Sequence, residues 1–143
     1  MTTRERICTV AREWVGTPFF PHGSKRHGAD CVGVLLGIYQ EAGLVPADVQ
    51  FPKYDLGGGE HLANSLVIQW LSSCPWVVAK SLPALPGDIV TIRLGRVDHH
   101  VMLVLENNEL LHSIRRYGCC IADMRDSTYA KRIQTCWAPK DER

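Results

Sequence analysis

The chain has 143 residues, of which 45% are hydrophobic and 22% charged, and its formal net charge at pH 7 is +1. This composition is that of an ordinary globular protein, and we expect one domain over 1–143. The small net charge gives no reason to expect nucleic acid or an anionic membrane as a partner, and no apolar run approaches the roughly 18 residues of a membrane helix. The N-terminus leads into an amphipathic segment, so we expect no secretory signal.

Three helices are predicted in the first half of the chain. Thr2 and Glu5 fit a capping box in front of an apolar pattern with helical spacing. Asp30 can cap the second helix and Gly43 can end it, and its interior is apolar on nearly every side, so we expect it to be buried. An irregular segment over 44–60 reads as a surface loop. The predicted helices span 3–15, 31–42 and 60–73.

Short β-rich segments are predicted from Trp76 onward, where the hydrophobic pattern changes. Helices followed by an antiparallel sheet place the chain in the α+β class. A doubly wound layout would need strands and helices in regular alternation, which the pattern does not show. The predicted strands span 76–79, 88–94, 100–106, 110–115 and 131–138.

Cys31 stands directly after Asp30, at the predicted start of the second helix. Backbone N–H groups at a helix N-terminus stabilise a thiolate and can also hold the oxyanion that forms when sulfur attacks a carbonyl. The alternative is that Cys31 is only a small residue at a tight helix entry. The other cysteines match no paired metal-ligand pattern, and we expect Cys8, Cys74 and Cys136 to be buried in the core.

A base for this thiol is available in the predicted hairpin of 100–106 and 110–115. His100 lies early in the first strand and His112 late in the second, so the two can meet and supply a base and a group that orients it. The alternative for either histidine alone is a partly exposed strand residue.

The parity of the turn decides whether these histidines can meet. With a two-residue turn at Asn107 and Asn108, His112 would lie opposite Leu103 and on the other face of the sheet from His100. We therefore predict an odd-length or bulged turn within 105–109, with both imidazoles on the face toward Cys31. A turn centred near Glu106 would place them directly opposite each other.

The chain carries four motifs in order: Thr17-Pro18-Phe19, Asp30-Cys31-Val32-Gly33, Pro86-Gly87-Asp88, and His100 with His112 twelve residues later. Together they resemble the NlpC family of papain-like cell-wall peptidases, and the resemblance covers about residues 5–138. The compact chain is most similar to the cell-wall peptidases of phages and gene-transfer agents. The resemblance implies a single papain-like domain that hydrolyses peptide bonds of the peptidoglycan stem, often next to D-glutamate, through an acyl-thioester.

Carried over to this sequence, the resemblance makes Cys31 the nucleophile, His100 the general base and His112 the group that orients the base. His99 is the rival for His100. We prefer His100 because the family has an aliphatic strand directly after the histidine, and Val101 follows His100. Nucleophile and base come from the protein, so we expect no metal and no organic cofactor.

The sequence departs from the family pattern at Phe19, where a tyrosine is usual. In the family, the hydroxyl of that tyrosine faces the site. Loss of one such hydrogen-bond donor can lower the rate on the order of a hundredfold where the donor is used. His22 can supply a polar group instead, or the backbone N–H of Cys31 can do most of the work. Phe19, His22 and Asp30 are therefore candidates for contacts to the oxyanion or the substrate. Met102 also replaces a usual small residue.

The remaining polar motifs have simpler interpretations. Cys119-Cys120 is expected to be structural packing, since vicinal cysteines rarely pair and no second couple of metal ligands follows. Arg115-Arg116 and Lys25-Arg26 are interpreted as solvated charges, with contact to stem-peptide carboxylates as the alternative.

The resemblance also suggests a biological setting and leaves two other functions open. A protein made in the cytoplasm without a signal fits delivery with a virion or phage tail, whose proteins would be partners while the enzyme acts on the cell wall. A thiol acyltransferase of related fold is one alternative, although that branch has its histidine before its cysteine. A non-catalytic tail or wall-binding module is the other, although loss of cysteine or histidine would be its mark.

Overall fold

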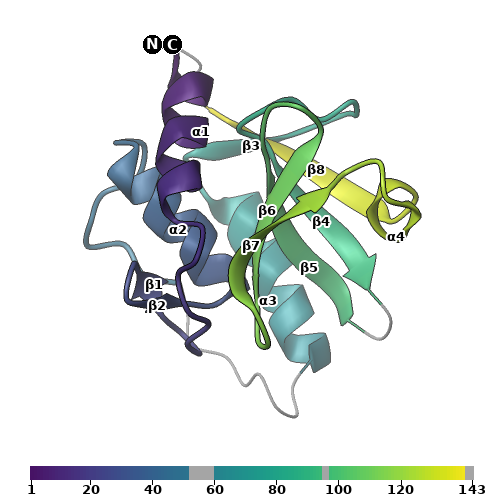
Figure 1. Cartoon of the computed structure of the whole chain (residues 1–143), viewed down its shortest axis with the longest axis horizontal. Coiled ribbons are helices and arrows are strands. Elements are labelled where there is room, and N and C mark those ends of the chain that lie inside the picture. Colours follow the sequence, from purple (N-terminus) through teal and green to yellow (C-terminus); the bar gives the residue numbers. More distant parts are fainter. Residues whose placement is uncertain (52–59, 95–96, 141–143) are drawn as a thin grey trace.

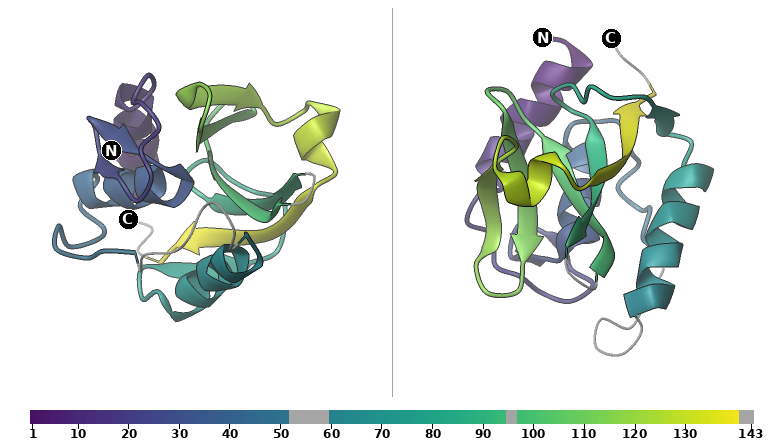
Figure 2. Two further views of the ribbon diagram at one scale, coloured as in Figure 1. Left: turned by 90° about the horizontal axis from the view of Figure 1, so that it is seen from below. Right: turned by 90° about the vertical axis from the view of Figure 1, so that its right-hand side faces the viewer.

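The computed structural model describes residues 1–51, 60–94 and 97–140, and within them the side chains of all residues except 60–66, 94, 97–99 and 127. Helices come first and an antiparallel sheet follows, which confirms the predicted α+β class. Helices α1, α2 and α3 lie along one side of the curved sheet, and the one-turn α4 lies at its other side (Figures 1 and 2). None of the helices in the described ranges is long and apolar enough to span a membrane.

The three predicted helices form close to their predicted ends because their boundary signals are local. Thr2 caps the first helix, where its hydroxyl accepts a hydrogen bond from the Glu5 N–H at 3.0 Å. Asp30 caps the second, and Gly43 follows its end with a φ of +86°. The helices are α1 (Thr3–Glu13), α2 (Cys31–Glu41), α3 (Glu60–Ser73) and α4 (Ser127–Ala130).

A six-stranded sheet has the order β3-β8-β4-β5-β6-β7, with every neighbouring pair antiparallel. Five of its strands match the five predicted segments. A separate two-stranded ribbon lies in the loop before α2. The strands are β1 (Ser24–Lys25), β2 (Gly28–Ala29), β3 (Val77–Lys80), β4 (Ile89–Leu94), β5 (Val97–Val104), β6 (Glu109–Ile114), β7 (Gly118–Asp123) and β8 (Ile133–Pro139).

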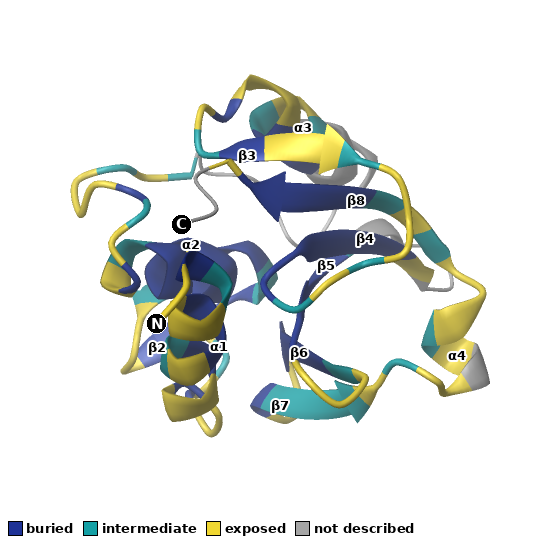
Figure 3. Ribbon diagram, turned by 90° about the horizontal axis from the view of Figure 1, so that it is seen from above, coloured by how far each residue is buried: buried dark blue, intermediate teal, exposed yellow. Residues whose placement is uncertain are grey.

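Two apolar clusters occupy the two faces of the sheet. The larger lies between the sheet and the helices, and it contains Val101 and Leu111 together with most of α2. Helix α2 is buried over most of its length, as its apolar sequence predicts (Figure 3). The smaller cluster lies on the opposite face around Met102 and Leu110, with Tyr129 of α4 packed against it.

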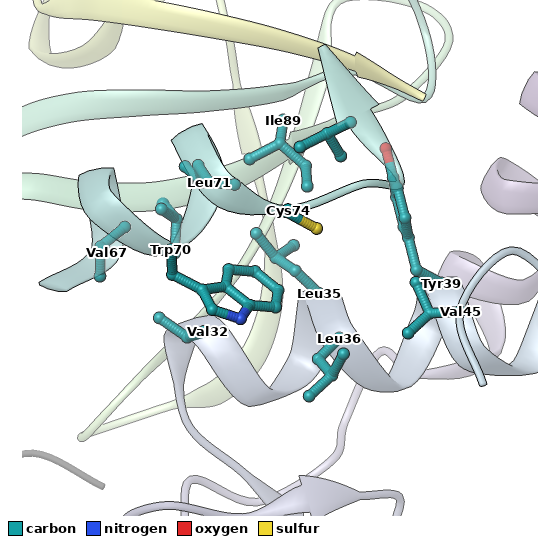
Figure 4. Close-up of a pocket in the computed structure, with 12 residues that line it drawn as sticks. Val32, Leu35, Leu36, Tyr39, Val45, Val67, Trp70, Leu71, Cys74 and Ile89 are labelled. Atoms are coloured by element: carbon teal, nitrogen blue, oxygen red, sulfur yellow. The ribbon is translucent and has the colours of Figure 1, made fainter. Parts of the chain in front are cut away.

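A small cavity remains between α2, α3 and the sheet, next to Val32 and Val101 (Figure 4). Its volume is about 20 Å³, which is enough for one water molecule at most. Its lining is mostly aliphatic. The hydroxyl of Tyr39, which also lines it, donates a hydrogen bond to the Gly87 carbonyl at 2.8 Å. The cavity is therefore a packing gap rather than a binding site.

Candidate active site

Cys31 is the first residue of α2, and Asp30 fixes the start of that helix. Asp30 is 2% exposed, and its two carboxylate oxygens accept hydrogen bonds from the Gly33 N–H at 2.7 Å and the His22 N–H at 2.9 Å. Cys31 itself is half-buried. Its sulfur therefore stands at a capped helix N-terminus, where the helix dipole favours the thiolate.

Steric crowding explains why the Asp-Cys-Val-Gly motif ends in a glycine, Gly33. A Cβ added at Gly33 would lie 1.7 Å from the carbonyl oxygen of Gly23. The same carbonyl accepts the Asp30 N–H at 3.2 Å, so the loop around Gly23 lies directly against the first turn of α2. Any larger residue at Gly33 would push this loop away from Cys31.

His100 and His112 are joined by a hydrogen bond, with 2.8 Å between His100 Nε2 and His112 Nδ1. Their ring centroids are 5.0 Å apart and the ring planes are 70° to each other. In the tautomer where His100 donates from Nε2, its Nδ1 carries no proton, which is the form that a general base needs. The hydrogen bond to His112 uses His100 Nε2 and does not involve His100 Nδ1.

Both imidazoles are neutral in the resting protein. Burial lowers the pKa of His100 to about 3, with a further contribution from a charge on His112, and burial lowers the pKa of His112 to about 4. An imidazolium in this pocket needs a counter-charge. A thiolate formed in the same proton transfer would supply one.

An odd-length turn brings the histidines together, as the parity argument predicts. Leu103 lies opposite Leu111, and the Leu105 N–H donates to the Glu109 carbonyl at 2.8 Å. Three residues are left in the turn, and two of them, Asn107 and Asn108, have φ of 62° and 59°. The turn is centred on Asn107 rather than near Glu106, so His100 and His112 are diagonal rather than direct neighbours.

Successive side chains of β5 and β6 point to opposite faces of the sheet, so His100 and His112 face away from the apolar cluster that contacts α2. The His112 ring lies 6.1 Å from the ring of Tyr129, which belongs to the smaller cluster on the face away from that helix. The prediction that both imidazoles lie on the sheet face toward Cys31 is therefore wrong as to the face, and a contact with Cys31 would have to be made at the end of the sheet where α2 begins. The pairing of Cys31 with His100 stays a prediction.

Ala29 ties that end of the sheet to the loop before Cys31. The Ser113 hydroxyl, one residue beyond His112, donates to the Ala29 carbonyl at 2.8 Å. Sequence reasoning could not find this contact, because a lone serine in a strand does not identify a partner in a distant loop. The bond fixes β6 beside the entry to α2.

The other candidates are placed as follows. His22 lines a cavity of about 330 Å³ beside Asp30, together with Ser24, Gly33, Leu36, Gln50 and Phe51. Phe19 is half-buried in the same loop. His99 belongs to β5, but its side chain lies outside the described residues. Asp30 offers its carboxylate oxygens as acceptors for the helix cap, so its role is to hold Cys31 rather than to donate to an oxyanion.

The cysteines expected in the core are buried there. Cys8, Cys74 and Cys136 are 1%, 8% and 3% exposed, and burial raises the pKa of each thiol. Cys119 and Cys120 are free thiols in β7, and burial raises the pKa of both. None of these five is activated as a nucleophile.

A helix-borne cysteine beside an antiparallel sheet with a pair of imidazoles defines the papain-like class of α+β domains. The chain belongs to the NlpC/P60 family, whose model matches residues 16–138. It is 23% identical over 130 residues to the murein DD-endopeptidase MepS/murein LD-carboxypeptidase of Escherichia coli K12, a match that covers 90% of this chain and 59% of that relative. The chain thus spans about three fifths of that protein.

Solved structures show the same fold. The NlpC/p60 domain of the peptidoglycan hydrolase SagA has a TM-score of 0.59 at 15% identity, over 93% of this chain and 96% of that one. NlpC1 from Trichomonas vaginalis has a TM-score of 0.64 at 18% identity, over 94% of this chain and 44% of that one. These likenesses confirm the predicted papain-like NlpC fold.

Proposed function

We propose that the chain is a cysteine peptidase that hydrolyses peptide bonds in the stem peptides of bacterial peptidoglycan. The observation that carries this proposal is the hydrogen-bonded pair His100–His112, together with the bond from Ser113, the residue after His112, to Ala29, which lies two positions before Cys31. The names of relatives support the substrate class, since both MepS and SagA are described as acting on murein or peptidoglycan.

The proposed reaction has two halves. His100 Nδ1 takes the thiol proton as the sulfur of Cys31 attacks the peptide carbonyl, and the N–H groups at the start of α2 stabilise the oxyanion. His100 then returns the proton to the leaving amine, which leaves an acyl-thioester on Cys31. Water attacks this thioester with His100 again as base, and the carboxylic acid product and the thiol are released. His112 orients the base throughout.

Digestion of purified peptidoglycan, with mass analysis of the fragments, tests this function. The wild-type protein should release stem-peptide fragments, and Cys31→Ala should reduce release by at least about a thousandfold while the fold is kept. Cys120→Ala is the matched control, because Cys120 is also half-buried but lies in β7. Release by Cys31→Ala at the wild-type rate would show that another residue is the nucleophile.

Thiol labelling separates a peptidase from a non-catalytic module. Iodoacetamide near neutral pH should modify Cys31 rapidly and Cys120 slowly, because burial raises the pKa of Cys120. Equal, slow labelling of both would favour a binding module that has kept the fold.

The phage setting is a further part of the proposal, and it rests on the sequence resemblance. We propose that the protein associates with a virion or tail, where it would open the cell wall locally. Its recovery with assembled particles after gradient purification is the expected result, and its recovery only with free protein would oppose this setting.

A further inference from the structure

Two guanidinium groups lie over aromatic rings at the turn between β6 and β7. The Cζ atom of Arg115 is 5.6 Å from the centroid of the Phe19 ring, and that of Arg116 is 5.8 Å from the Tyr117 ring. Both arginines are exposed, and neither has an acidic partner among the described residues. Arg26, by contrast, is paired with Glu13 and Glu41, and this removes it as a candidate for binding a substrate anion.

The turn is fixed to the loop that carries Phe19. The Cys119 N–H donates to the Thr17 carbonyl at 2.8 Å, and the Gly16 N–H donates to the Cys119 carbonyl at 2.9 Å. Gly118 has a φ of +71°, and a Cβ there would lie 2.4 Å from the Thr17 carbonyl oxygen. These backbone contacts place the turn that carries Arg115 beside the loop that carries Phe19.

The same loop borders the entry to Cys31. The Ala29 N–H donates to the Pro18 carbonyl at 3.0 Å, and the Phe20 N–H donates to the Ala29 carbonyl at 3.3 Å. Phe19 is thus held between two hydrogen bonds to the residue that lies two positions before Cys31. Because Ser113 also bonds to Ala29, the end of β6 that leads to Arg115 lies beside the loop that enters α2.

We propose that Arg115, supported by the Phe19 ring, binds a carboxylate of the stem peptide next to the scissile bond. An arginine held over a ring by a cation–π contact keeps N–H groups available, and these match a carboxylate with two hydrogen bonds. The inference rests on the proposed function and names the charge that its substrate must carry. It also gives Phe19 a role for which the ring is sufficient and the usual tyrosine hydroxyl is not needed.

Binding to the Cys31→Ala protein tests this inference without turnover. Calorimetry would compare a stem tetrapeptide with two versions, one amidated on its D-glutamate carboxylate and one on the side-chain carboxylate of its diamino acid. One of the two amidations should weaken binding about tenfold or more, which identifies the carboxylate, while the other should have little effect. Equal affinity for all three peptides, or no detectable binding of any, would overturn the inference.

Second substitutions in the same protein assign the effect to Arg115. Arg115→Gln should weaken binding of the unmodified tetrapeptide about tenfold and abolish its sensitivity to amidation. Arg116→Gln, the matched control, should keep both, and Phe19→Tyr should keep the preference while Phe19→Leu reduces it. An equal loss in Arg116→Gln would reveal only a diffuse positive field and would also overturn the inference.

Failure of the inference and failure of the proposed function have different signatures. A wild-type protein that releases peptidoglycan fragments but shows no carboxylate preference has the proposed activity without this recognition. A protein that binds the carboxylate through Arg115 yet releases no fragments has the recognition without the peptidase activity.

Discussion

Asp88 and the pair His100–His112 lie on the sheet in opposite electrostatic settings. Asp88, at the start of β4, is fully buried but has charged partners: its oxygens lie 2.7 Å from Arg4 Nη1 and 2.8 Å from Lys80 Nζ, and they also accept the Leu85 N–H at 2.8 Å. Burial alone would raise the pKa of Asp88, but these partners hold it below its ordinary value. The imidazoles of His112, which is buried, and His100, which is half-buried, bond to each other and are uncharged.

This comparison distinguishes a residue that stabilises the fold, Asp88, from the two histidines, which can take part in proton transfer. Asp88 belongs to the Pro-Gly-Asp motif, and its carboxylate is held as a fixed anion that joins α1, through Arg4, to the sheet. A group with its charge fully compensated has no reason to exchange a proton. The histidine pair is neutral, so it can receive one when a thiolate forms nearby.

The largest expected effect is on the chemical side of this comparison. His100→Ala should reduce kcat/KM for stem-peptide hydrolysis by about 10²–10⁴, because proton transfer in both half-reactions depends on it. The matched control is His99→Ala, which should retain most activity. Steady-state kinetics on a synthetic stem peptide would measure both variants, and a reversed ranking would make His99 the base.

On the structural side, Asp88→Ala should lower the free energy of unfolding by up to about 3–5 kcal/mol, since it leaves the half-buried cations Arg4 and Lys80 without their anion. The activity of the molecules that remain folded should change little. Urea unfolding and kinetics below the transition would measure the two effects separately. A stable variant with lost activity would mean that Asp88 belongs to the site.

The histidine pair and Asp88 should make the free energy of unfolding depend on pH in two different pH ranges. The pKa of each histidine is lowered on folding, so the unfolded chain binds protons that the native pair does not, and stability is lost as the pH falls from about 6.5 toward 4. The pKa of Asp88 is also lowered, so its contribution is present above the unfolded pKa near 3.8 and is lost below it.

Urea titrations between pH 3 and pH 8 would resolve these ranges. The double variant His100→Gln/His112→Gln should flatten the slope between about pH 4 and 6.5 but keep the loss at lower pH. Asp88→Asn should do the reverse. An unchanged slope in the double variant would show that the histidines are protonated equally in the folded and unfolded states.

Local signals explain which parts of the molecule could be predicted from sequence. Thr2, Asp30 and Gly43 mark helix ends through bonds to their own neighbours, and the spacing of His100 and His112 required an odd-length turn whatever the rest of the fold. Strand β7 and the short ribbon β1–β2 were missed, because their few residues form strands only when paired with distant or adjacent partners. The position of Arg115 over Phe19 depends on tertiary packing and left no trace in spacing.

The smallest expected effect concerns the departure at Phe19. Phe19→Tyr keeps the ring that supports Arg115 and adds a hydroxyl where family members usually have one. If that hydroxyl reaches the developing oxyanion, it stabilises the transition state more than the bound substrate, so kcat should rise several-fold while KM stays unchanged. Phe19→Leu is the control that removes the ring, and its KM should rise. An unchanged or lower kcat in Phe19→Tyr would show that the N–H groups at the start of α2 or His22 already serve the oxyanion, and that the pocket is shaped around phenylalanine.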